Sequence, residues 1–254
     1  MEDRDLQILK HVAHFRVSIP AVIRTLFFPN NPSAYAPVMD RLRKNGYLKS
    51  RRALKKNGTF HQLTRTSTRI LGLPESLAVP MGRQALLRQL SILWFCTMRQ
   101  PPFTYIADSV TLGPLFSGGS TVGNAPFAPA GAHCIANVGG MTLFHIYVVM
   151  PDTGRDNLFK SIWSQYDAAK REPMLAPLVD AKQYGFAILV QSEVKREVID
   201  AFLHGRIRGN SQRVAGAPLS SRARFLVECV PNFEKTVPDS QSPTVKEPAN
   251  GTLG

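Results

Sequence analysis

The most concentrated chemical feature of this sequence is a group of positively charged side chains. Between Arg41 and Arg69 the chain has ten Lys or Arg residues and no Asp or Glu. Each Lys or Arg that contacts a phosphate releases condensed counterions, so a run of this kind suits a polyanion such as a nucleic-acid backbone. A basic run by itself is commonly a solvated surface, but the lack of any acid within this one favours phosphate binding.

The rest of the chain does not share this charge. Residues 1–100 contain 17 Lys or Arg and 5 Asp or Glu, whereas residues 101–254 contain 14 and 13. Almost all of the formal net charge of +13 therefore lies in the first part. Such an asymmetry is expected of a nucleic-acid-binding module that is joined to a neutral one.

The apolar spacing around the basic run predicts three helices and a hairpin. The helices are expected over 5–15, over 19–28 with Ser18 as its N-cap, and from about 35 to 45. After Gly46 the pattern changes to two short strands that turn at Asn57-Gly58. This order is typical of a winged helix-turn-helix, in which the third helix enters the major groove of DNA.

The DNA contacts predicted from this pattern fall into two groups. Side chains of the first turns of the third helix should face the bases, and basic side chains at its end and on the hairpin should hold phosphates. The first group is Ser33, Tyr35, Ala36 and Asp40, and the second is Arg41, Arg43, Lys44, Lys49, Arg51, Arg52, Lys55 and Lys56.

The remainder of the chain has the alternation of an α/β domain. A helix with a wide apolar face is expected over 82–99, where the face would belong to the core or to a dimer contact and the helix would link the two domains. Strands are expected over 103–106, 134–138, 142–149, 186–190 and 225–230, with helices over 157–170 and 194–203. A sheet with helices packed on it follows, which makes the chain α/β, or α+β overall.

These elements predict four segments. They are a winged helix-turn-helix over 1–78, a linking or dimerisation helix over 79–100, an α/β domain over 101–230, and a tail over 231–254. The tail consists mainly of Pro, Ser, Thr, Glu and Lys, so we expect it to be disordered.

The order of the parts resembles the plasmid replication-relaxation family, in which a winged helix precedes a domain related to restriction endonucleases. The resemblance spans roughly residues 3–205. It is carried by Met39-Asp40-Arg41-Leu42-Arg43-Lys44-Asn45-Gly46-Tyr47-Leu48, by His61-Gln62-Leu63-Thr64, by Val149-Met150-Pro151-Asp152-Thr153-Gly154 to Tyr166, and by Ile188-Leu189-Val190-Gln191-Ser192 to Leu203. It implies a cytoplasmic bacterial protein, associated with the nucleoid or a plasmid, that regulates transcription or assists plasmid replication or transfer.

The resemblance also implies a nuclease centre, with carboxylates on adjacent strands that hold Mg²⁺ and a Lys that helps to activate water. The chain departs from this pattern. Where a Pro-Asp pair should stand it has Ala130-Gly131-Ala132-His133, and the strand that should carry an acid and a Lys runs from His145 to Met150 without an acid. Asp152 and Asp156 lie at a turn and a helix start, where acids are ordinary. We therefore expect a nuclease-like domain without catalytic residues, metal or cofactor.

Two alternatives stay open. The chain could be a metal-dependent nuclease whose acids lie elsewhere, at Asp108, Asp152 and either Asp167 or Glu172. It could also be an adaptor whose α/β domain binds another protein while the first domain holds DNA. We expect a homodimer because winged-helix proteins usually act in pairs on palindromic sites.

The cysteines, histidines and apolar runs argue against a disulfide-bonded, a zinc-binding and a membrane protein. Cys96, Cys134 and Cys229 are odd in number and widely spaced, so they predict neither a disulfide framework nor a zinc finger, and a reducing compartment fits them best. His133 and His145 lie near Cys134 without further ligands at zinc spacing. The longest apolar runs are too short or too interrupted to cross a bilayer, so no membrane contact is expected.

Overall fold

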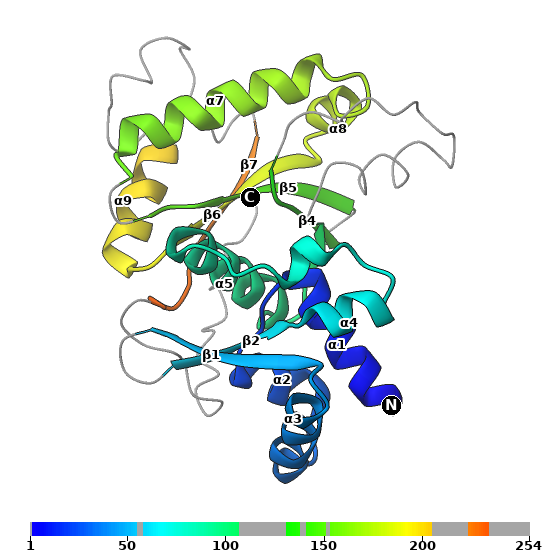
Figure 1. The fold of residues 1–254 in the computed structure, drawn as a ribbon. Coiled ribbons are helices and arrows are strands. Elements are labelled where there is room, and N and C mark those ends of the chain that lie inside the picture. The colour runs from blue at the N-terminus through cyan, green and yellow to red at the C-terminus, as the bar shows by residue number, and fades with distance from the viewer. Residues whose placement is uncertain are drawn as a thin grey trace. The chain divides into compact units, whose positions relative to one another are not determined.

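The computed structural model describes residues 2–54, 58–106, 131–137, 141–150, 153–204 and 223–233. The chain divides into two compact units (Figure 1). The first unit consists of the described residues within Met1–Pro80 and Thr97–Pro101. The second unit consists of those within Met81–Cys96 and Pro102–Glu234. The helices and the mixed sheet make the chain α/β, or α+β overall, as the sequence predicted.

The first unit begins with three helices that are followed by an antiparallel hairpin. Its elements are α1 (Asp3–Phe15), α2 (Pro20–Phe27), α3 (Tyr35–Lys44), β1 (Leu48–Leu54) and β2 (Gly58–Leu63). A 3₁₀ turn, η1 (Pro32–Ala34), leads into α3, and α4 (Arg65–Ile70) with η2 (Glu75–Ala78) closes the unit. The order and type of the first five elements agree with the sequence-based expectation.

The core of the first unit explains this arrangement. Ile8, Leu9 and Val12 of α1 pack in one buried cluster with Leu42 of α3 and Leu63 of β2. The spacing of three and four residues on α1 therefore produces a single apolar stripe that faces the other elements. The chain leaves α3 through Gly46, whose φ of +69° is the left-handed conformation that ends many helices.

Ser18 does not cap α2 as expected. Ile19 holds the N-cap position, and Ser18 is buried in a β-bridge in which its N–H donates to the His61 carbonyl at 3.0 Å. The His61 N–H donates back to the Ser18 carbonyl at 2.8 Å. This pairing fixes Ser18 in an extended conformation, and its hydroxyl shares a hydrogen bond of 3.0 Å with His11 instead.

The second unit is built on a five-stranded mixed sheet with strand order β3-β4-β5-β6-β7. The strands are β3 (Thr104–Ile106), β4 (His133–Asn137), β5 (Met141–Val148), β6 (Tyr184–Val190) and β7 (Arg224–Cys229). The first three are antiparallel, while β5, β6 and β7 are parallel to one another. Parallel neighbours need crossover connections, which here contain α7 (Arg155–Arg171), α8 (Ala176–Asp180) and α9 (Glu193–Leu203).

Helices cover both faces of this sheet. Tyr184, Phe186 and Ile188 of β6 belong to one buried cluster with residues of α7, α8 and α9. On the other face Phe103 lies between Phe95 of α5 (Arg83–Thr97) and Phe144 of β5. Figure 1 shows α5 and α7 on opposite sides of the strands. Because both faces are covered, every residue of β6 is buried, which accounts for its unbroken apolar sequence.

Gly185 permits the close approach of β7 to β6. A Cβ atom at this position would lie 2.6 Å from the carbonyl oxygen of Arg224 and 3.0 Å from the Phe144 ring. Any larger residue would push the strands apart, so the close spacing of the parallel pair depends on this glycine.

Helix α5 lies almost entirely in the second unit, where its Phe95 packs against Phe103. Two segments differ from expectation. Helix α8 covers Ala176–Asp180, where no helix was expected. Phe233, which was assigned to the disordered tail, is fully buried and its ring lies 6.3 Å from that of Trp94. A single aromatic residue in a polar segment is a weak sequence signal, although its buried area is large. Residues 234–254 lie outside the described part.

We predict that Phe233→Ala lowers the free energy of unfolding by about 3–5 kcal/mol, the usual cost of removing a buried Phe. Val194→Ala is the control, because Val194 is 71% exposed and should change stability by less than about 0.5 kcal/mol. Urea unfolding of both variants, followed by tryptophan fluorescence, measures the difference. Equal stabilities would show that Phe233 does not belong to the core.

Candidate nucleic-acid interface

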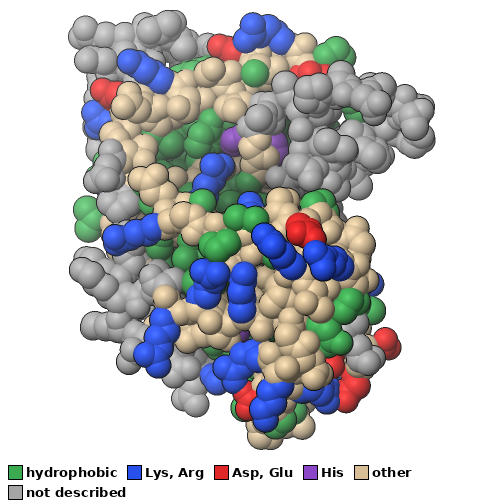
Figure 2. All heavy atoms as spheres, viewed as in Figure 1, with side chains coloured by type: hydrophobic (Ala, Val, Ile, Leu, Met, Phe, Trp, Pro, Cys, Tyr) green, Lys and Arg blue, Asp and Glu red, His purple; other side chains and the backbone are tan. Residues whose placement is uncertain are grey.

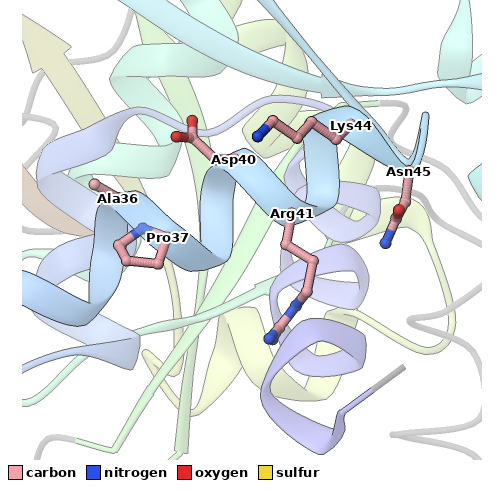
Figure 3. Close-up of a pocket in the computed structure, with 6 residues that line it drawn as sticks. All are labelled: Ala36, Pro37, Asp40, Arg41, Lys44 and Asn45. Atoms are coloured by element: carbon pink, nitrogen blue, oxygen red, sulfur yellow. The ribbon is translucent and has the colours of Figure 1, made fainter.

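Helix α3 has one buried side and one solvent-facing side. Val38, Met39 and Leu42 are buried in the first unit. The opposite side borders a shallow hollow of about 550 Å³. Its lining residues are Ala36, Pro37, Asp40, Arg41, Lys44 and Asn45 (Figure 3). The period of the helix thus places small, acidic and basic side chains on one accessible surface.

Tyr35 is placed differently from the sequence-based assignment, which had it facing the bases. Its side chain is only 8% exposed and its hydroxyl shares a hydrogen bond of 3.0 Å with Nε2 of His61. Burial raises the pKa of the hydroxyl to about 12, against an opposing effect of the Arg24 and Arg43 charges. Tyr35 therefore anchors the start of α3, because an aromatic ring at this point of the helix stripe turns toward the core.

His61 of β2 forms hydrogen bonds with residues of several other elements. Its Nδ1 shares a hydrogen bond of 2.9 Å with the Ser50 hydroxyl on β1, while Nε2 meets Tyr35 on α3. Its backbone pairs with Ser18 before α2. Burial, with a further effect of the Arg43 charge, lowers the pKa of His61 to about 4, so the imidazole is neutral near pH 7. A neutral ring can donate through one nitrogen and accept through the other.

Arg41 is engaged by acids of the first helix. Its guanidinium lies 2.7 Å from Asp5 and 2.7 Å from Glu2, and the Asp5 side chain is only 4% exposed. Figure 3 shows Arg41 pointing toward α1 and away from Asp40 and Lys44. These two acids raise the pKa of Arg41 through their hydrogen bonds with it. Arg41 therefore fixes α3 to α1, a role that the sequence did not suggest.

Two further basic residues of the predicted set have partners in the first unit. Lys49 donates to the Ala78 carbonyl at 3.0 Å, and burial together with the Arg51 and Arg65 charges lowers its pKa. Arg43 forms an ion pair with Asp40 on the exposed side of α3. The Lys49 contact joins the hairpin to η2, whereas the Arg43 pair remains accessible to a ligand.

The other predicted contacts lie at the surface where the structure describes them. Ser33, Ala36, Lys44 and Arg52 are exposed, and Arg51 is half-buried on β1. Lys55 and Lys56 lie outside the described residues. Figure 2 shows Lys and Arg side chains gathered over the hairpin and α3 on the drawn face. The hairpin and the exposed side of α3 together form the candidate interface.

Sequence reasoning missed four residues around this interface. Pro37 and Asn45 line the hollow, and two arginines from outside the basic run lie over aromatic rings. The Arg24 guanidinium is 4.6 Å from the centre of the Tyr35 ring, and that of Arg4 is 5.2 Å from the centre of the Phe28 ring. Each arginine is isolated in the sequence, so only the packing of the helices places them near α3.

A histidine pair joins β4 and β5, the two strands on which the sequence resemblance implied acids. His133 of β4 and His145 of β5 are register partners, and their rings share a hydrogen bond of 3.1 Å. Burial is the main cause that lowers their pKa values, to about 4 for His133 and about 3 for His145. The described strands β4 and β5 carry no carboxylate, and no three potential metal ligands gather elsewhere among the residues that the structure describes.

Comparisons with protein-family models, curated proteins and solved structures found no match to this chain. Within the described ranges, no helix has the length and apolar character needed to cross a bilayer.

We predict that Asp5→Ala lowers the free energy of unfolding by about 1.5–3 kcal/mol, because it removes a buried hydrogen bond to a charged group. Asp3→Ala is the matched control, since Asp3 lies on the same helix turn but is exposed. Chemical unfolding at pH 7 measures both. Equal effects of the two substitutions would contradict the anchoring role of the Asp5–Arg41 pair.

The buried histidines predict a loss of stability in acid. In the folded chain the pKa of His61 is about 4, which is lower than its ordinary value of 6.5. The contribution of the neutral ring to stability is therefore fully present above pH 6.5. As the pH falls from about 6.5 to about 4, the unfolded chain binds a proton that the folded chain does not, and stability decreases. His133 and His145 act in the same direction.

Urea unfolding at several pH values tests this dependence. Each such histidine should lower the free energy of unfolding by up to about 1.4 kcal/mol per pH unit within its window. His61→Gln cannot titrate and should reduce the slope by that amount, although it lowers stability at pH 7. An unchanged slope in this variant would show that the pKa of His61 is the same in the folded and the unfolded chain, which contradicts its lowering by burial.

Proposed function

We propose that the chain is a non-enzymatic double-stranded DNA-binding protein whose first unit is a winged helix. In this proposal α3 is the recognition helix and the β1–β2 hairpin is the wing. The observation that carries it is the position of Lys44 and Arg52, which are exposed, and of Arg51, which is half-buried beside Arg52 on β1, while Arg41 and Lys49 have partners within the fold.

The shape of the first unit supports a duplex as the ligand. The major groove of B-DNA is wide enough for one α-helix, and α3 offers a side that is accessible along its length. A hairpin beside such a helix lies over the flanking backbone, where arginine and lysine contact phosphates. A single-stranded ligand would favour exposed aromatic rings for base stacking, whereas Tyr35 is buried.

For the second unit we propose a role in dimerisation or in binding a protein partner. The support is chemical: β4 and β5, the strands on which the family resemblance implies acids, have no carboxylate and are joined by neutral, mutually bonded histidines. A pair of this kind supplies neither the negative charge that holds Mg²⁺ nor a base that is poised near neutral pH. In keeping with the resemblance, we propose regulation of transcription or assistance of plasmid replication or transfer in the bacterial cytoplasm, as a homodimer.

The salt dependence of DNA binding tests the wing. Arg51→Ala and Arg52→Ala should each reduce the slope of log affinity against log salt by about 0.9 if each arginine contacts one phosphate. They should weaken binding to all duplexes alike, because phosphate contacts carry no sequence information. Fluorescence anisotropy of labelled duplexes at several salt concentrations gives the slopes.

The control for this experiment is Lys160→Ala, which removes an exposed charge from α7 in the second unit. It should leave the slope unchanged. If Lys160→Ala reduces the slope and the hairpin substitutions do not, the DNA surface lies on the second unit and the wing assignment is wrong. If the native protein binds no duplex even at low salt, the proposed function itself fails.

A further inference from the structure

The ion pair between Asp40 and Arg43 lies within α3 itself. It stands on the solvent-facing side of α3, with the Arg43 side chain 47% exposed and the Asp40 side chain 50% exposed. By contrast, the Asp5–Arg41 pair joins two helices. We propose that Asp40 and Arg43 together recognise one C·G base pair in the major groove. This inference rests on the proposed function and names the base pair that α3 would select.

Base-edge chemistry favours this pair. In the major groove cytosine presents its N4 amino group as a donor, and guanine presents O6 and N7 as two acceptors. A carboxylate accepts from cytosine N4, and a guanidinium donates to both guanine acceptors. Asp40 and Arg43 are three residues apart on one helix side, so their acceptor and donor groups can meet the two bases of a single pair.

The neighbouring side chains allow the short aspartate to reach a base. Asp40 lies one turn beyond Ala36 and Pro37, which are exposed and form part of the same hollow. Neither side chain is long enough to hold the helix backbone away from the groove floor. Lys44, one turn further along, can reach the phosphates that border the groove, because its long stem extends past the helix surface.

The intramolecular pair also prepares Arg43 for recognition. Asp40 already holds one side of the guanidinium, so less side-chain freedom is lost when the remaining N–H groups meet guanine. An exposed ion pair contributes little to folding. Substitutions of Asp40 should therefore alter base selection while the first unit stays folded.

Selection of duplexes from a randomised library tests the inference. The native protein should enrich sites that have one position fixed as C·G, and Asp40→Ala should relax that position by roughly tenfold, within the range of one good base contact. Asp40→Asn should change the preference at the same position toward A·T, because an Asn amide pairs with adenine N6 and N7. The salt slope should stay as in the native protein.

Asp3→Ala is the matched control, because it removes the same charge from an exposed site on α1. It should leave the selected sites unchanged. The inference is overturned if the native protein selects sites that Asp40→Ala and Asp40→Asn also select, or if no selected position is fixed as C·G. Either result leaves DNA binding intact, whereas failure of the native protein to bind any duplex would overturn the proposed function as well.

Discussion

The geometry of the first unit depends on one buried imidazole. His61 meets Tyr35 at the start of α3, Ser50 on the neighbouring strand and, through its backbone, Ser18 before α2. These contacts set the angle between the proposed recognition helix and the proposed wing. A neutral ring can donate to one of the two hydroxyls and accept from the other, and burial favours that state by lowering the pKa of His61 to about 4. The charged surface is thus positioned by an uncharged group.

The basic run contains residues in two environments that its sequence does not distinguish. Arg41 and Lys49 have partners that hold α3 and the hairpin in place, whereas Lys44 and Arg52 stay at the surface. The difference arises from residues far along the chain. Asp5 reaches Arg41 from the first helix, and the Ala78 carbonyl reaches Lys49 from beyond the hairpin. Counting charges therefore overstates the number of side chains that are available for phosphates.

Local patterns predicted the order of the elements well because helix and strand periods are properties of short segments. The three helices, the hairpin and most strands of the second unit follow this order. Tyr35, Ser18 and Phe233 were assigned wrongly for a shared reason: the environment of each is decided by distant partners. His61 holds the first two, and Trp94 packs against the third. The Asp40–Arg43 pair lies within one helix, yet its exposure is seen only once the buried side of α3 is known.

Hydrogen exchange of the full chain, with and without a duplex at low salt, tests most directly whether α3 and the hairpin form the DNA surface. If α3 and the hairpin bind the duplex, amides in segments that cover α3 and β1 should exchange more slowly when DNA is present. Amides of α7, which lies in the second unit, should change little. Protection confined to the second unit, with α3 unchanged, would contradict this prediction and would move the DNA-binding surface away from the basic run.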